Sequence, residues 1–185
     1  MTCIVGLVHQ QAVYLGADSA ALSDLDVTVR ADPKLFRNSQ FLIGFTTSFR
    51  MGQLLRFAFT PPPLQGDLLH YMATDFVDAV RTCLKAGGYA RRENEVEEAG
   101  RFLVGVLGCL FAVHSDYQVE EAANGSLAIG SGAAHALGAL YAAQALHAAP
   151  MARLELALQA AAFHGAGVRE PFVYMVDTRS EERDA

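Results

Sequence analysis

The chain has 185 residues, of which 52% are hydrophobic and 18% are charged. This balance excludes a disordered protein, and the length fits one domain with a sizeable core. The net charge of −6 and the lack of a Lys/Arg cluster argue against nucleic-acid or anionic-membrane binding. No apolar run has membrane-spanning length and no signal segment opens the chain, so we expect a cytoplasmic protein.

The sequence carries no signature of a cofactor. Its cysteines (Cys3, Cys83 and Cys109) are far apart in apolar surroundings, which indicates reduced thiols rather than disulfides or a metal site. The six histidines have no metal-ligand spacing, and both glycine-rich phosphate-binding motifs are absent. We therefore expect neither a metal nor an organic cofactor.

The first half of the chain changes from strand-like to helix-like periodicity near residue 48. Alternation and β-branched residues predict a hairpin at the start, then short strands; helical spacing then predicts a short helix and a longer one that Gly87-Gly88 closes. The predicted elements are strands 2–9, 12–17, 26–30, 34–37 and 40–45, and helices 49–58 and 67–86.

The second half of the chain likewise begins with predicted strands, continues with two predicted helices, and ends with a single strand. The charged stretch 91–100 is interpreted as a solvated loop, and 178–185 as a polar tail. Between them we predict strands 101–107, 109–113, 117–120 and 127–129, helices 133–148 and 151–163, and a last strand 172–176. Two antiparallel sheets that pack on each other with helices outside satisfy this order, so we expect an α+β fold, a four-layer α-β-β-α sandwich, in one domain over 1–185.

Thr2 is the first candidate functional residue. Initiator methionine is normally removed before a small residue, and removal of Met1 would leave a threonine with a free α-amine. Such an amine has a pKa of about 7.7–8.0 and can act as the base for the hydroxyl of the same residue. The alternative is that Met-Thr is a common start without functional meaning.

Three further polar residues stand at the ends of predicted strands. Asp18 ends the second strand, Lys34 is one of only two lysines among 14 basic residues, and Ser131 lies in Gly130-Ser131-Gly132 before an alanine-rich helix. Taken singly, each residue also has an ordinary structural interpretation: Asp18 as a turn aspartate, Lys34 as a surface lysine and Ser131 as a helix N-cap.

Taken together, these motifs resemble the proteasome β-subunit and HslV family of N-terminal nucleophile hydrolases. The offsets from Thr2 are 18 − 2 = 16 to Asp18 and 34 − 2 = 32 to Lys34, which match the family without a gap. The resemblance extends over residues 2–176. It implies that Thr2 attacks a peptide or amide carbonyl, that Lys34 keeps the amine unprotonated, that Asp18 holds Lys34, and that Ser131 bonds the amine.

The resemblance also implies partners: a peptide or unfolded-protein substrate, further copies of the chain in stacked homo-oligomeric rings, and a ring ATPase that delivers substrate.

Two departures from the family pattern leave alternatives open. The segment that supplies the oxyanion N–H reads Thr46-Thr47-Ser48, where a backbone N–H can still serve. The last long helix is not followed by the usual aspartate, and His164 is either a polar substitute or an ordinary helix-ending histidine. A non-catalytic ring-forming scaffold and an amidase for a small amide therefore remain alternatives.

Overall fold

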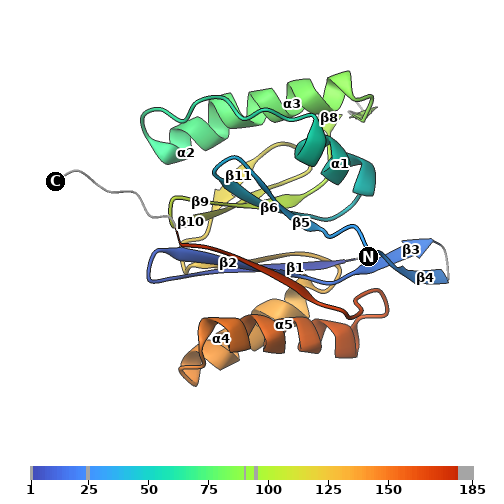
Figure 1. Ribbon diagram of the computed structural model, residues 1–185, viewed down its shortest axis with the longest axis vertical. Helices are drawn as coiled ribbons and strands as arrows, with labels where there is room; N and C mark the ends of the chain where they lie inside the picture. Colours follow the sequence, from blue (N-terminus) through green and yellow to red (C-terminus); the bar gives the residue numbers. More distant parts are fainter. Residues whose placement is uncertain (1, 24–25, 90, 94–95, 179–185) are drawn as a thin grey trace.

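The computed structural model describes residues 2–23, 26–89, 91–93 and 96–178. It confirms the α+β class predicted from the sequence, with antiparallel strand pairs throughout these residues (Figure 1). In chain order the elements are β1 (Cys3–His9), β2 (Ala12–Ala17), β3 (Ala20–Ser23), β4 (Asp26–Val29), β5 (Leu35–Asn38), β6 (Phe41–Phe45), α1 (Phe49–Phe57), α2 (Leu68–Tyr71), η1 (Met72–Phe76), α3 (Val77–Ala86), β7 (Arg91–Glu93), β8 (Val96–Glu98), β9 (Phe102–Val106), β10 (Cys109–Val113), β11 (Val119–Glu121), β12 (Ser126–Gly130), α4 (Ala133–Ala145), α5 (Pro150–His164) and β13 (Val173–Asp177).

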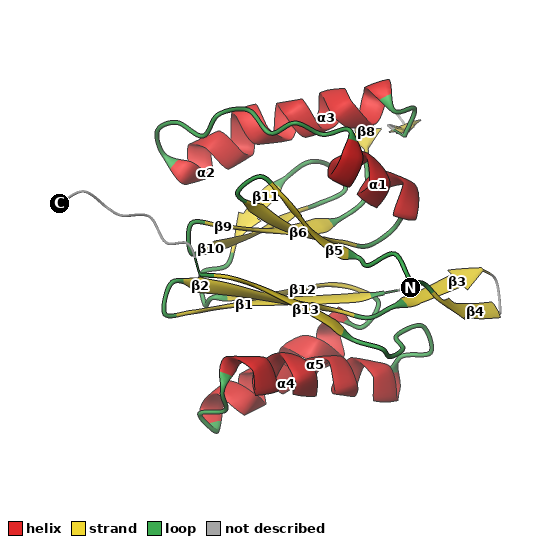
Figure 2. Ribbon diagram, in the orientation of Figure 1, coloured by secondary structure: helices red, strands yellow, loops and turns green. Residues whose placement is uncertain are grey.

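Two sheets lie face to face at the centre of the molecule. One has the strand order β12-β1-β2-β13 and the other β11-β10-β9-β6-β5. Figure 2 shows α4 and α5 on the outer face of the first sheet, and α1, α2 and α3 on the outer face of the second. Each sheet is therefore covered on both faces, which explains why its central strands are apolar throughout.

Strand β1 shows how the sequence builds these layers. Successive side chains of a strand point to opposite faces. Cys3, Val5 and Leu7 pack with the helices α4 and α5, whereas Ile4 packs between the sheets. All four side chains are fully buried, so the strand that begins directly after Thr2 is fixed on both sides.

The helices over the second sheet pack on an aromatic cluster. Phe41 of β6 stacks on Tyr71, and its ring centroid lies 4.9 Å from that of Phe76. The predicted long helix is divided here, because Met72–Phe76 forms a π-helical turn between α2 and α3. The predicted glycine closure is confirmed, with Gly87 as the C-cap of α3.

One prediction from the sequence is wrong, and one strand was missed. The stretch 91–100 is not only a loop, because β7 and β8 pair with basic positions opposite acidic ones, Arg91 with Glu98 and Arg92 with Glu97. The strand at 26–30 has a partner that the sequence analysis missed, β3, whose Ala-Ala-Leu-Ser sequence lacks β-branched residues. The predicted polar tail lies outside the described residues from 179 onward.

Gly44 tests the close packing between the sheets. A Cβ at this position would lie 2.7 Å from side-chain atoms of Ile4 and Leu35, so Gly44→Ala overpacks the interior. We expect it to lower the free energy of unfolding in urea by about 1–3 kcal/mol. Gly138→Ala is the control, because nothing lies within 4 Å of its added methyl on α4; it should raise stability by about 0.5–1 kcal/mol. Equal stability of the two variants would contradict this description of the interface.

Candidate active site

Strand pairing brings distant residues to one end of the first sheet. Cys3 of β1 pairs with Gly130 of β12, so the residues next to them, Thr2 and Ser131, lie together. The Thr2 backbone nitrogen donates to Ser131 Oγ at 3.3 Å. Asp18 directly follows β2, which pairs with β1 on its other side, so three of the candidate residues lie at the same end of the sheet.

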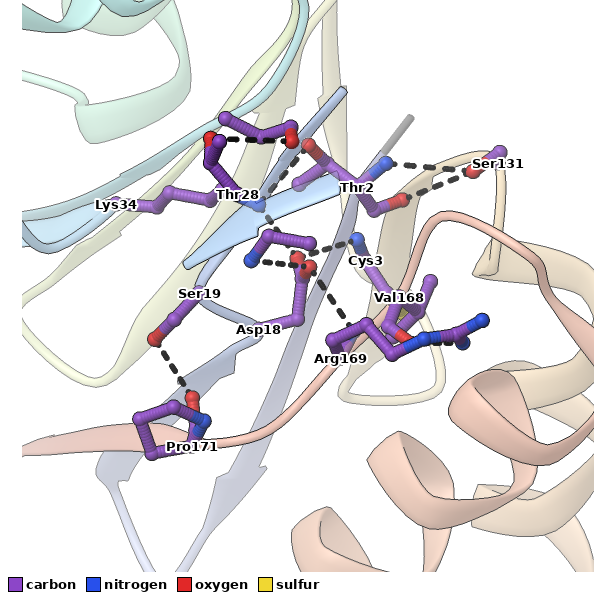
Figure 3. A network of polar contacts seen from close by, with 12 residues as sticks. Thr2, Cys3, Asp18, Ser19, Thr28, Lys34, Ser131, Val168, Arg169 and Pro171 are labelled. Atoms are coloured by element: carbon purple, nitrogen blue, oxygen red, sulfur yellow. Dashed lines mark hydrogen bonds and ion pairs between the residues drawn. The ribbon is translucent and has the colours of Figure 1, made fainter. Parts of the chain in front are cut away.

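Lys34 reaches this end of the first sheet from the second sheet, where it directly precedes β5. Its Nζ donates to Asp18 Oδ1 at 2.7 Å and to Thr2 Oγ1 at 3.1 Å (Figure 3). Lys34 is 2% exposed, Asp18 1% and Thr2 6%. The surface-lysine alternative is therefore wrong, and the site lies where the two sheets meet.

Asp18 is held from several sides. Its Oδ1 accepts from the Cys3 N–H as well as from Lys34, and its Oδ2 accepts from the N–H groups of Ala20 at 3.0 Å and Arg169 at 3.4 Å. Both oxygens of the carboxylate thus accept hydrogen bonds, and the ammonium of Lys34 is one of the donors. Asp18 thus does more than end a strand: it fixes the position of the Lys34 ammonium.

Burial shifts the pKa values of two side chains near Thr2, those of Lys34 and Cys3. Burial lowers the pKa of Lys34, and the adjacent Asp18 carboxylate opposes this shift. Burial, together with the nearby Asp18 charge, raises the pKa of the Cys3 thiol to about 12. The thiol beside Thr2 therefore stays protonated at neutral pH, and thiolate is the reactive form of cysteine.

Ser131 is not a helix cap. The N-cap of α4 is Gly132, which has no side-chain capping bond. Ser131 Oγ instead lies 3.3 Å from the Thr2 nitrogen and 3.5 Å from the Thr2 carbonyl oxygen. The Gly132 N–H also donates to that carbonyl, at 3.3 Å. This loop therefore binds the backbone of Thr2 on both sides of its Cα.

A cleft of about 90 Å³ opens beside the Thr2 side chain. Within its wall, the Thr46 N–H donates to the Arg101 carbonyl at 3.0 Å, and the Ser48 N–H donates to the Thr46 carbonyl at 2.9 Å. Ser48 Oγ caps helix α1. Of the three amides in this segment, that of Thr47 has no hydrogen bond among the described residues, which makes it the candidate oxyanion donor. The residues that line the cleft are Thr2, Ala20, Ala21, Leu22, Lys34, Phe45, Thr46, Thr47, Ser48 and Phe49.

His164 is the last residue of α5, and its contacts are with aromatic rings. Its ring stacks on His135 with centroids 5.0 Å apart and meets Phe163 edge-on. The interpretation as a helix-ending histidine is therefore confirmed. The segment after α5 reaches the site through a backbone group, the Arg169 N–H on Asp18, and not through an acid.

Two contributors were missed in the sequence. Gly130 has a φ of +97°, and a Cβ there would overlap the Thr2 carbonyl oxygen, so only glycine fits. The glycines that flank Ser131 were a usable signal for this. No pattern in the sequence indicates the Arg169 contact, because any residue except proline supplies a backbone N–H.

The described residues include neither a metal-binding cluster nor a membrane span. In the parts of the chain that the structure describes, no group of three or more His, Cys, Asp or Glu side chains could hold a metal ion. None of the helices in those parts has the length and apolarity needed to cross a lipid bilayer.

Known structures share this architecture. No family model and no curated protein matches the chain. The chain is similar to BPH of Thiobacillus denitrificans in complex with epoxomicin (22% identity, 95% of this chain, 97% of that one, TM-score 0.79). It is also similar to HslV of Trypanosoma brucei (18%, 94% and 98%, TM-score 0.66) and to Anbu, an ancestral beta-subunit, of Yersinia bercovieri (13%, 94% and 80%, TM-score 0.67).

These neighbours show the fold of the chain. The chain has the fold of the proteasome β-subunit and HslV group of N-terminal nucleophile hydrolases. The resemblance inferred from the sequence is thereby confirmed at the level of the fold.

Asp18→Asn tests the buried ion pair. The variant leaves the Lys34 ammonium buried without its counter-charge and replaces one acceptor oxygen by a donor. We expect a loss of about 3–5 kcal/mol in the free energy of unfolding, measured in urea. Asp32→Asn is the matched control, because its pair with Arg30 is 37–42% exposed and contributes about 0–1 kcal/mol. Similar losses in both variants would show that burial of the Asp18 pair is unimportant.

Proposed function

We propose that the chain is a proteasome-like N-terminal threonine hydrolase that cleaves peptide bonds, with Thr2 as the nucleophile after removal of Met1. The observation that carries the proposal is the contact of Lys34 Nζ with Thr2 Oγ1 at 3.1 Å inside a buried ion pair. The helix-sheet-sheet-helix order in Figure 2 also supports a single four-layer α-β-β-α domain of this class.

The proposed reaction begins at the Thr2 hydroxyl. Its oxygen attacks the substrate carbonyl carbon while its proton passes, through a water molecule, to the α-amine of the same residue. The Lys34 ammonium stabilises the alkoxide character of Oγ and disfavours protonation of the amine before attack. Ser131 Oγ, 3.3 Å from the Thr2 nitrogen, holds the amine in place.

The oxyanion of the tetrahedral intermediate requires a preorganised donor. Thr47 N–H serves this role in our proposal, because the neighbouring amides of Thr46 and Ser48 are bonded within the protein. Collapse of the intermediate gives the leaving amine the proton held by the α-amine and leaves an ester on Thr2. Water then hydrolyses this ester, which releases the acyl group as a carboxylic acid and regenerates the Thr2 hydroxyl.

The Thr2 chemistry is tested with the native protein. The expected results are an intact mass that lacks Met1, hydrolysis of fluorogenic peptides, and a mass increase equal to one epoxomicin, the compound bound by the Thiobacillus denitrificans protein. Thr2→Ala should abolish hydrolysis and labelling, because the residue stays small enough for Met1 removal but has no hydroxyl. Thr82→Ala, on the exposed face of α3, is the matched control.

Two outcomes would reject this proposal. Retention of Met1 blocks the amine and removes the base. A trimmed chain that neither hydrolyses peptides or small amides nor reacts with epoxomicin would be a scaffold.

We also propose that the chain forms a homo-oligomeric ring assembly in the cytoplasm and takes peptide or unfolded-protein substrate, with a ring ATPase as a partner. Apolar side chains on α4, at its C-cap and on α5 support contact with a second copy: Tyr141 is 80% exposed, Leu146 80% and Phe163 86%. A groove of about 500 Å³ lies between the two helices. Apolar surface of this kind marks protein interfaces.

Phe163→Glu tests the assembly. A charge in the apolar groove would be desolvated by a second copy, so we expect a lower native mass by light scattering, with unchanged circular dichroism. Leu69→Glu, a 44% exposed position on α2, should leave the mass unchanged. An unaltered mass for Phe163→Glu would place the contact between copies elsewhere.

A further inference from the structure

The segment that follows β6 leaves its sheet in an unusual way. The Ser48 N–H donates to the Thr46 carbonyl two residues earlier, at 2.9 Å, and the central residue, Thr47, has a φ of +75°. This is a γ-turn in its rarer, strained form. A β-branched residue avoids such a conformation, so other contacts must hold it there.

Those contacts come from the residues before β9. Phe45 and Phe102 pair in the β6–β9 ladder, and the Thr46 N–H continues the ladder with a 3.0 Å bond to the Arg101 carbonyl. An antiparallel pair normally exchanges two such bonds, so the Arg101 N–H would be expected on the Thr46 carbonyl. It donates instead to Thr47 Oγ1, at 3.3 Å.

The threonine hydroxyl thus occupies the place of a backbone carbonyl. This substitution leaves the Thr46 carbonyl available for Ser48. Gly100 makes room for it, since a Cβ on Gly100 would lie 2.9 Å from the Thr47 Cβ. The side chain of Thr47 is exposed, and its oxygen is held by the Arg101 N–H.

The direction of the Thr46 carbonyl decides the direction of the next amide. The peptide bond between Thr46 and Thr47 is trans, so the Thr46 carbonyl and the Thr47 N–H lie in one plane and point in opposite directions. If the carbonyl turned to the Arg101 N–H, the plane would rotate and the Thr47 N–H would turn with it. The Thr47 hydroxyl accepts the hydrogen bond of the Arg101 N–H and thereby prevents this rotation.

We propose that the Thr47 side chain is a positioning group for hydrolysis: its hydroxyl caps the Arg101 N–H and thereby holds the Thr47 amide in the orientation of the oxyanion donor. This inference rests on the proposed function of Thr2. It assigns the role to a threonine side chain at a position where backbone conformation alone would favour glycine.

Thr47→Val is the deciding variant, because valine keeps the branched shape and removes the hydrogen-bond acceptor. Loss of one oxyanion donor lowers kcat by about 10²–10³-fold, and we expect misorientation to cost about tenfold or more. KM should hardly change, since the donor acts in the transition state. Thr47→Ser, which keeps the hydroxyl, should retain most of the activity, and Thr82→Val on α3 is the control for a surface hydroxyl.

Amide hydrogen exchange at Arg101 provides a readout that does not depend on catalysis. It should be about fivefold or more faster in Thr47→Val than in the wild type and in Thr47→Ser. A wild-type protein without hydrolytic activity would refute the proposed function, and unchanged Arg101 exchange would still refute the capping contact. Normal kcat in Thr47→Val with an active wild type would overturn the positioning role alone.

Discussion

The buried ion pair between Lys34 and Asp18 is the interaction on which the rest of the site depends. Removing two charges from water is costly, and the cost is met only where geometry and additional hydrogen bonds are favourable. Here the two partners come from different sheets, and backbone N–H groups from three segments complete the carboxylate shell. The pair can therefore form only when both sheets are assembled, which couples the site to the folding of the whole chain.

The backbone and the side chain of Thr2 are bound by different parts of the structure. Its backbone is bound by the Gly130–Gly132 loop, whereas its side chain faces Lys34 and the cleft. Glycine at 130 permits this close approach of two backbones. The nucleophile proposed here is thus held through its main chain, and its hydroxyl remains accessible to a substrate that enters the cleft.

Much of this could be predicted from the sequence, and the limits have physical causes. Alternating β-branched residues predicted β1 and β2, and the family resemblance carried by Thr2, Asp18 and Lys34 implied that these residues share one site. Strand β3 was missed because alanine and serine carry little strand preference, and β7–β8 because charged residues resemble a solvated loop until their partner strand is known. The γ-turn at Thr47 could not be predicted, since its stabilising contact comes from Arg101, 54 residues away.

Cys3 gives the site a further property. It follows the proposed nucleophile directly, yet its side chain is fully buried on the face of β1 that packs against helices, with a thiol pKa raised to about 12. Alkylating agents and peroxides react with exposed thiolates, and Cys3 offers neither exposure nor ionisation at neutral pH. The chemistry proposed for this cleft should therefore tolerate oxidative conditions that inactivate cysteine-dependent hydrolases.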